Sequence, residues 1–160
     1  MKKQITYITL GVIGAGVLVT TYFNRDPKRT IPTDGLLVSP ADGVIKSIVD
    51  NRIEIFIRLT SVHVQRMPCD CTILNIKNDD NYNDFFTIFT KYGEILIERK
   101  GGILARSLRT FVKEGDRLNK GDEFGRILLG SHCWITLPDS FDTLKVKVGD
   151  VLKAGETILA

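Results

Sequence analysis

The sequence predicts a mostly β protein: a compact β-sandwich or barrel-like domain preceded by one N-terminal transmembrane helix. Three observations support this prediction. Residues 5–23 carry no charge, short apolar segments separated by Gly or Asp fill the chain from Gly35 onward, and one eleven-residue pattern occurs twice. A chain of 160 residues has room for one such core. We therefore expect an anchor and linker over residues 1–32 and a β domain over residues 33–160.

The uncharged N-terminal stretch reads ITYITLGVIGAGVLVTTYF, with Lys2 and Lys3 before it and Arg25 after it. As a helix, its nineteen residues would rise about 28 Å, which is close to the hydrocarbon thickness of a bilayer. A buried core helix and a cleaved signal peptide are the alternatives, but residues 20–23 make a poor cleavage site. The stretch predicts a membrane-bound protein and leaves its orientation open, because positive charge flanks both ends.

The net excess of positive charge lies at this end of the chain. Residues 1–32 hold five Lys or Arg and one acid, so the rest of a chain with net charge +3 carries −1. A slightly acidic body argues against nucleic-acid binding. Arg25, Lys28 and Arg29 are expected either to flank the span or to meet anionic lipid headgroups. Asp26-Pro27 and Ile31-Pro32 predict an extended linker, because proline keeps the preceding residue out of the helical region.

The clearest strand is residues 53–59, IEIFIRL, which alternate strictly as a half-buried strand should. Further strands are expected at Val62–Gln65, Thr72–Ile76, Phe85–Thr90, Glu94–Ile97, Ile103–Leu108, Gly125–Leu129, Cys133–Leu137 and Leu144–Val148. No stretch after Phe23 shows a helical period. The body is therefore expected to be all β or nearly so.

The repeated pattern is V-K-x-G-D-x-L-x-x-G-[DE], found at Val112–Asp122 and again thirty-four residues later at Val146–Glu156. Glycines six apart fit two tight turns around a short apolar strand, where positive φ is needed. The pattern resembles the folded-over hairpins of biotinyl and lipoyl carrier domains. Those carriers present a lysine at a hairpin tip, whereas no lysine occurs between Ile127 and Thr143. The resemblance therefore extends to carrier-like hairpins and not to the carrier function.

Three residues stand out as candidate catalytic groups: Asp42, His63 and Ser131. Each has an ordinary structural explanation: Asp42 as a turn residue before Gly43, His63 as a structural histidine on the mixed face of a strand, and Ser131 as part of a common Gly-Ser pair. Together, a carboxylate, an imidazole and a hydroxyl are the parts of an activated serine. With His63 as base and Asp42 as its partner, Ser131 can attack the carbonyl of Gly130, where the missing Cβ eases the approach.

Five motifs then resemble the phosphatidylserine decarboxylase family, in the order in which that family has them. They are FNRDPKR at residues 23–29, LVSPADG at 37–43, VHVQRMP at 62–68, LGS at 129–131 and VGDVLKAGET at 148–157. The resemblance covers residues 23–160 and is greatest to the compact prokaryotic or archaeal form.

The resemblance implies a zymogen that cleaves itself between Gly130 and Ser131. Ser131 would become a covalent pyruvoyl group, the cofactor, at the start of fragment 131–160. This fragment would remain with fragment 1–130 as a heterodimer, and a homo-oligomer is left open. Asp42 and His63 match the processing carboxylate and base. The implied activity is that of a lyase that decarboxylates membrane phosphatidylserine to phosphatidylethanolamine.

The chain also departs from the family pattern. The usual Asn-Glu-Arg segment has no clear counterpart, and His132 occupies a position where the compact form commonly has arginine. His132 could perturb processing, donate a proton or face solvent. Cys69, Cys71 and Cys133 predict reduced thiols, with a zinc site as the alternative and no metal as our expectation. The rival functions are a membrane-tethered binding domain that has lost processing and a zinc-stabilised structural module.

Overall fold

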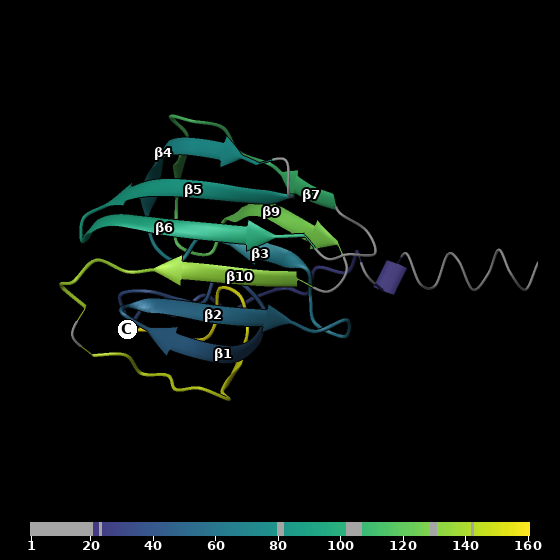
Figure 1. Ribbon diagram of the computed structural model, residues 1–160, viewed down its shortest axis with the longest axis horizontal. Coiled ribbons are helices and arrows are strands. Elements are labelled where there is room, and N and C mark those ends of the chain that lie inside the picture. The colour runs from purple at the N-terminus through teal and green to yellow at the C-terminus, as the bar shows by residue number, and fades with distance from the viewer. Residues whose placement is uncertain (1–20, 23, 80–81, 102–106, 129–130, 142) are drawn as a thin grey trace, which may run out of the picture.

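The computed structural model describes residues 21–160, apart from residues 23, 80–81, 102–106, 129–130 and 142 (Figure 1). The strands are β1 (Gly43–Val49), β2 (Arg52–Ile57), β3 (Val64–Arg66), β4 (Cys71–Asn78), β5 (Asn83–Thr90), β6 (Gly93–Lys100), β7 (Ser107–Thr110), β8 (Arg117–Leu118), β9 (Glu123–Leu128), β10 (Ser131–Thr136) and β11 (Val151–Leu152). The predicted span at residues 5–23 lies almost wholly outside this described part. Within it, no helix is long and apolar enough to cross a membrane.

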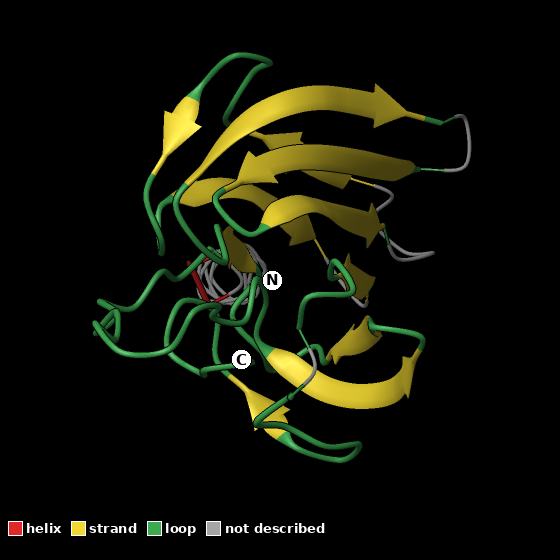
Figure 2. Cartoon of the chain, turned by 90° about the vertical axis from the view of Figure 1, so that its left-hand side faces the viewer, coloured by secondary structure: helices red, strands yellow, loops and turns green. Residues whose placement is uncertain are grey.

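The strands form two antiparallel sheets. The larger has the order β11-β1-β2-β10-β6-β5-β4-β8, and the smaller has the order β3-β9-β7. Figure 2, turned by 90° from Figure 1, shows how strongly the strands curve and how the sheets lie as layers. The prediction of a mostly β domain is confirmed.

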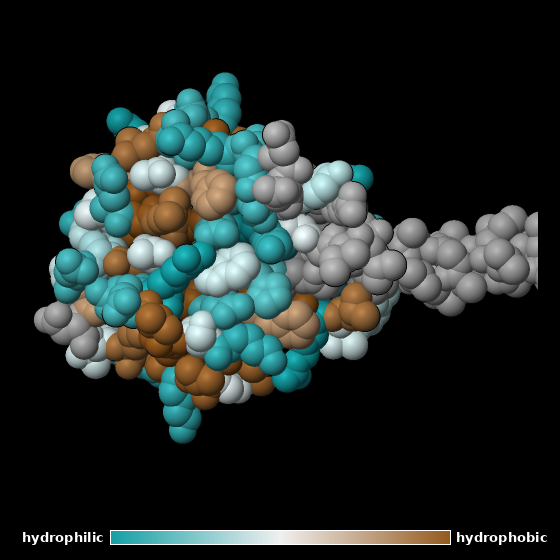
Figure 3. All heavy atoms as spheres, in the orientation of Figure 1, coloured by the Kyte–Doolittle hydropathy of each residue, from teal (hydrophilic) through white to brown (hydrophobic). Residues whose placement is uncertain are grey.

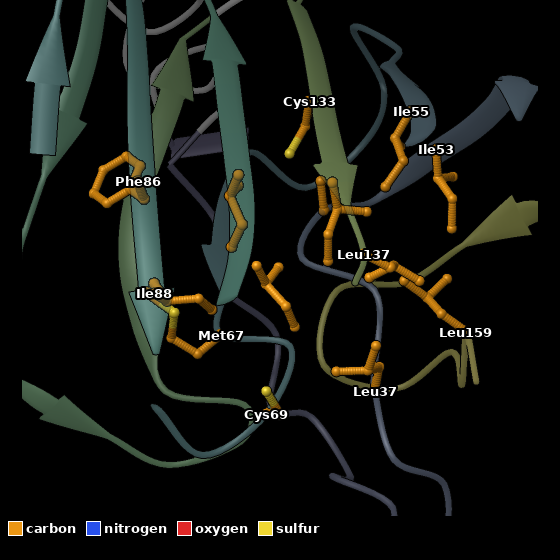
Figure 4. Packing of buried hydrophobic residues seen from close by; sticks show 14 of the residues in the cluster. Leu37, Ile53, Ile55, Met67, Cys69, Phe86, Ile88, Cys133, Leu137 and Leu159 are labelled. Carbon is orange, nitrogen blue, oxygen red and sulfur yellow. The ribbon is translucent and has the colours of Figure 1, made fainter. Parts of the chain in front are cut away.

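Side-chain alternation along the central strands builds the core between the layers. Ile53, Ile55 and Ile57 of β2 are fully buried, as are Cys133 and Ile135 of β10 (Figure 4). Successive side chains in a strand point to opposite faces, so the residues between them lie on the outer face. The alternation read from residues 53–59 is thus that of a half-buried strand, which ends at Ile57.

The strand expected at Leu144–Val148 is wrong. Residues 144–150 are irregular, and the strand in this region is the two-residue β11. The reason is a turn: the carboxylate of Asp150 accepts the backbone N–H of Lys147 at 2.9 Å, and the Asp150 N–H is donated back to the Lys147 carbonyl at 3.1 Å. An aspartate that bonds the backbone locally in this way competes with strand pairing.

The two sheets are joined by a buried polar cluster around Arg99, which is fully inaccessible to solvent. Its guanidinium lies between the rings of Phe86 and Phe124, at 4.7 and 5.2 Å. It is hydrogen-bonded to side chains from three other segments, namely Asp84 of β5, Gln65 of β3 and Thr110 of β7. A buried cation persists only when it is paired and fully bonded, as this one is. The cluster fixes β3 against the larger sheet.

An internal pseudo-two-fold relates two copies of one structural unit. The first copy combines Ser39–Ser47 with Val146–Glu156, and the second combines Met67–Asn75 with Val112–Asp122. In the first copy, Ile45 exchanges backbone hydrogen bonds with Gly149 and Asp150. In the second copy, Ile73 does the same with Gly115 and Asp116.

The two copies also touch symmetrically. The N–H of Val38 is donated to the carbonyl of Pro68, and the N–H of Arg66 to the carbonyl of Pro40. The register of both leading strands shifts at matching places, between Ile45 and Ser47 in β1 and between Ile73 and Asn75 in β4. The repeat read from the sequence is therefore half of a larger duplicated unit. Its glycine turns do have positive φ, from 76° at Gly155 to 94° at Gly149.

Candidate active site

Asp42 lies in the turn that leads into β1, and its carboxylate accepts hydrogen bonds from two other segments of the chain. Its Oδ1 accepts the backbone N–H of Ala154 at 2.7 Å, which ties the turn to the C-terminal repeat. One guanidinium nitrogen of Arg29, Nη2, donates to both carboxylate oxygens, at 2.9 and 3.0 Å. The side chains of Arg29 and Asp42 are only 6% and 13% exposed. This is an ion pair largely shielded from water, where electrostatic attraction is stronger than at the surface.

His63 lies in the segment between β2 and β3 and is 1% exposed. Burial lowers its pKa below the ordinary value of 6.5, and the nearby positive charges of Arg25 and Arg126 lower it further. The backbone at Ser61 and the negative charge of Asp42 act in the opposite direction. The net effect is a neutral imidazole at pH 7, which is the form a general base requires. Asp42 is the anion among the charges that act on it.

The backbone of His63 is paired with the strand that leads to the predicted cleavage site. Its carbonyl accepts the N–H of Ile127 at 3.1 Å, and Val64 pairs with Arg126 where β3 meets β9. Gly130 lies outside the described residues. Ser131 begins β10, where its backbone pairs with Ile57 of β2.

The predicted cleavage between Gly130 and Ser131 lies immediately before β10. β10 is paired on one side with β2 and on the other with β6, by hydrogen-bonded registers that run from residue 131 or 132 to Thr136. A new N-terminus at residue 131 would remain held by both neighbours.

His132 lies on the outer face of the larger sheet. Its Nδ1 is 2.8 Å from Oε1 of Glu54, and its ring stacks on Trp134 with centroids 5.3 Å apart. The centroid of the Phe56 ring lies 5.2 Å from that of His132, with the two rings tilted by 57°. Its neighbours in β10 on the opposite face, Cys133 and Ile135, are buried in the core. Of the three roles considered for His132, the structure supports the outward-facing one.

That outer face carries apolar and charged side chains side by side, as Figure 3 shows. Its exposed apolar residues include Leu74, Phe89 and Leu96 of β4, β5 and β6. Charged residues, including Glu54 and Arg52 of β2, lie among them. His132 belongs to this mixed surface.

The three cysteines are buried and unpaired with one another. Burial raises the thiol pKa to about 12 for Cys69, about 11 for Cys71 and about 12 for Cys133. A zinc ligand must be a thiolate, so zinc binding would have to displace the protons of these thiols. Over the residues that the structure places, no three Cys, His, Asp or Glu side chains are grouped to hold a metal ion. Nothing in this part of the chain supports the zinc alternative.

Arg29 is the site residue that sequence reasoning missed. It was expected at the membrane flank or on lipid headgroups, and it is instead buried against Asp42. The physical reason is that the linker crosses the Asp42 turn, where an unpaired carboxylate would be costly to bury. The only sequence signal was its place at the end of the motif at residues 23–29.

Comparison with known proteins gives one consistent family. A family model described as phosphatidylserine decarboxylase matches residues 18–160. A Methanosarcina mazei protein, named as a candidate archaetidylserine decarboxylase proenzyme, is 35% identical over 89% of this chain and 74% of its own length. A relative of the same name from Methanosarcina barkeri is 31% identical over 99% of this chain and 82% of its own.

A bacterial relative agrees with the archaeal ones. The phosphatidylserine decarboxylase proenzyme of Cereibacter sphaeroides is 35% identical over 91% of this chain and 76% of its own length. The family-model match spans the residues that include Asp42, His63 and Ser131. The chain belongs to the phosphatidylserine decarboxylase family.

Proposed function

We propose that this chain cleaves itself between Gly130 and Ser131 and then decarboxylates phosphatidylserine to phosphatidylethanolamine. The observation that carries the proposal is the burial of His63, whose backbone is paired with the strand leading to residue 130 and whose pKa is lowered by that burial. Family membership supplies the reaction class. The catalytic assignments of Asp42, His63 and Ser131 are part of the proposal.

In self-cleavage, His63 takes the proton from the hydroxyl of Ser131 while the oxygen attacks the carbonyl carbon of Gly130. The peptide C–N bond breaks, the nitrogen takes up a proton, and an ester joins Gly130 to the Ser131 oxygen. Removal of the Cα proton of residue 131 then breaks its Cβ–O bond and releases Gly130 as a carboxylate. The resulting enamine takes up one water and loses ammonia, which leaves a ketone at residue 131. Asp42 stabilises the imidazolium formed in the first step.

The pyruvoyl group at residue 131 would supply a carbonyl that takes up the substrate amine and accepts the electron pair as carbon dioxide leaves. The chain's own contribution is to hold residue 131 at the start of β10, between β2 and β6. His63 lies beside β9 and is buried from water, so it is suited to return a proton to the substrate carbon.

The substrate class follows from what the names of the relatives share, which is a serine phospholipid. The archaeal relatives are named for archaetidylserine and the bacterial one for phosphatidylserine. We propose phosphatidylserine, with the headgroup as the reacting part. Assays with both lipids in mixed micelles, scored by release of carbon dioxide, distinguish the two. Activity on the archaetidyl lipid alone would contradict this choice of substrate.

We also propose that residues 1–32 anchor the domain of residues 33–160 at a membrane. Tyr22 and Arg25, at the C-terminal end of the proposed anchor, both donate hydrogen bonds to the carbonyl of Thr60 in the β2–β3 connection. These two residues therefore lie at the end of the domain where β10 begins, since Ile57 at the end of β2 pairs with Ser131. Leu59 in the same connection is 52% exposed. A tether at this end would keep a lipid headgroup near the site. Alkaline extraction of membranes from expressing cells tests it, and release of the full chain into the soluble fraction would overturn it.

The decisive test of the proposed function is the mass of the purified full chain. We expect two fragments, 1–130 and 131–160, with the smaller one lacking an N-terminal amine and reacting with hydroxylamine. Ser131→Ala should remain one chain with an unchanged circular dichroism spectrum and melting temperature. A wild-type chain that stays whole after prolonged incubation would overturn the proposal and leave a non-enzymatic binding domain.

A further inference from the structure

The linker that precedes the domain is strapped to it by side-chain contacts. We call residues 25–31 the linker strap. Asp26 is bridged by Nη2 of Arg66, at 2.8 Å to each carboxylate oxygen. Further along, the N–H of Thr30 is donated to Glu156 at 3.1 Å. Ile31 lies so close to Gly121 and Gly155 that a Cβ at either glycine would come within 3.0 Å of it.

Arg29 is the point at which the strap meets the candidate active site. Its Nη2 bridges both oxygens of Asp42, and its Nη1 lies 3.9 Å from Glu156. The side chain is 6% exposed, which is unusual for arginine in a segment without regular structure. The contact therefore requires an explanation beyond a solvated positive flank.

The pseudo-two-fold shows that the same turn forms without an ion pair where its aspartate is exposed, as Asp70 is. Asp70 is the counterpart of Asp42 in the second copy, and it accepts the backbone N–H of Lys120 at 2.8 Å as Asp42 accepts that of Ala154. No ion pair to Asp70 occurs among the residues that the structure describes. The backbone hydrogen bond suffices to hold the turn in that copy. The arginine is thus an addition to the copy that carries the catalytic candidate.

We propose that Arg29 is a positioning residue for self-cleavage: it holds the Asp42 carboxylate in the orientation in which that carboxylate serves His63. The proposal rests on the proposed function, because it assigns Arg29 a part in the same reaction. A carboxylate held only by the Ala154 N–H could turn about its Cβ–Cγ bond. Bridging of both oxygens by one nitrogen fixes the plane of the group, and low exposure strengthens the contact.

The charged groups around the pair are consistent with this role. Arg25 and Arg126 are the cations that act on His63, and Asp42 is the anion. Arg29 faces Asp42 directly and Glu156 at longer range. Without Arg29, the Asp42 carboxylate would be held by the Ala154 N–H alone, and the plane of the group that stabilises the imidazolium would no longer be fixed. The consequence falls on the rate of proton removal from Ser131.

The test is a double-mutant cycle on the full chain, made by cell-free synthesis so that cleavage can be followed from time zero. Arg29→Met removes the charge and keeps much of the apolar stem, and we expect self-cleavage to slow about 10- to 100-fold, as misplacement of a catalytic group does. Arg29→Lys should recover most of the rate, because only one nitrogen of Arg29 contacts Asp42. In an Asp42→Asn background, Arg29→Met should have little further effect.

Asp26→Asn is the matched control, because it weakens another ion pair of the same linker strap with the same bridging geometry. It should change the melting temperature about as Arg29→Met does and leave the cleavage rate within about twofold. The proposal would be overturned if Asp26→Asn slowed cleavage as much as Arg29→Met does, or if Arg29→Met cleaved at the wild-type rate. It would also be overturned if the rate losses of Arg29→Met and Asp42→Asn multiplied in the double variant. If Arg29→Met does not fold, Arg29→Lys is compared with Arg29→Gln. A folded Arg29→Lys chain that cleaves itself no faster than Arg29→Gln would contradict the proposal. An uncleaved wild-type chain, by contrast, overturns the proposed function itself.

Discussion

The two copies of the duplicated unit use the same aspartate in different surroundings. Asp42 and Asp70 each close a turn by accepting one backbone N–H. Asp42 also meets Arg29 and acts on His63. Asp70 borders a cavity of about 320 Å³ whose lining includes Lys91 and Lys120. The difference indicates that the shared function of the two carboxylates is to close the turn. The catalytic role proposed for Asp42 depends on Arg29 and His63, which lie outside the duplicated unit.

The largest expected effect comes from substituting the two aspartates separately and comparing the self-cleavage rates of the two variants. Asp42→Asn and Asp70→Asn each leave an oxygen that can accept the backbone N–H, so both chains should fold. Asp42→Asn removes the anion that stabilises the His63 imidazolium and should slow self-cleavage roughly a thousandfold or more. Asp70→Asn should leave it unchanged. The measurement is the rate of appearance of fragment 131–160 by mass spectrometry, and similar rates in the two variants would contradict the functional asymmetry.

The pH dependence sharpens the comparison, because His63 belongs to the asymmetric part of the structure. Its pKa is lowered from 6.5 by burial. The self-cleavage rate should therefore be flat above about pH 6.5 and fall only in more acidic solution.

Stability should follow the same group. The unfolded state binds the His63 proton at higher pH than the folded state does, so the free energy of unfolding of uncleaved Ser131→Ala should decline as the pH falls below 6.5 toward the lowered pKa. Urea titrations from pH 5 to 8, with Ser131→Ala/His63→Gln as the control, measure this slope. An equal slope in both chains would assign it to other groups.

A smaller effect tests the pseudo-two-fold through its glycines. Gly115 and Gly149 are counterparts with positive φ and open space beside them. Alanine at either one should cost about 1–2 kcal/mol from backbone strain alone. Gly121→Ala should cost about 1 kcal/mol more, because its Cβ would lie 2.4 Å from Ile31 of the linker strap. Chemical denaturation of Ser131→Ala chains measures these costs, and unequal values for Gly115 and Gly149 would weaken the symmetry.

The smallest expected effect concerns His132, which follows the cleavage site in sequence and lies on the outer face. His132→Gln should leave the cleavage rate within about twofold and lower the free energy of unfolding by under about 1 kcal/mol, the scale of one cross-strand contact. The same mass and denaturation measurements apply. A large loss of cleavage with the fold intact would restore the idea that His132 donates a proton.

Much of the fold could be predicted because it depends on local patterns. Alternation over residues 53–59 reports a strand with one buried face, and its isoleucines are indeed in the core. The glycines spaced six residues apart predict turns that need positive φ, and Gly115, Gly121, Gly149 and Gly155 all have it. The strand expected at Leu144–Val148 was wrong because the Asp150 side chain bonds the backbone locally, which a count of apolar residues does not register.

The candidate site could be predicted only in part. Asp42 and His63 stood out as residue types in known motifs, and the negative charge of Asp42 acts on the pKa of His63. The equivalence of Asp42 and Asp70 could not be read from the sequence, since Ser39–Ser47 and Met67–Asn75 share only three identical residues of nine. The role of Arg29 was hidden as well, because an arginine near an apolar stretch has the same pattern whether it faces lipid or a buried carboxylate.

The sequence by itself determined the mostly β class, the glycine turns of the repeat and the family motifs, since each is encoded within a few neighbouring residues. Only the tertiary structure decided which aspartate meets a guanidinium, which histidine is buried and which one faces outward. Those outcomes depend on pairings between residues far apart in the chain, such as Arg29 with Asp42 and His132 with Glu54. Such pairings are set when the sheets close around one core, because burial makes an unpaired charge costly and so selects its partner.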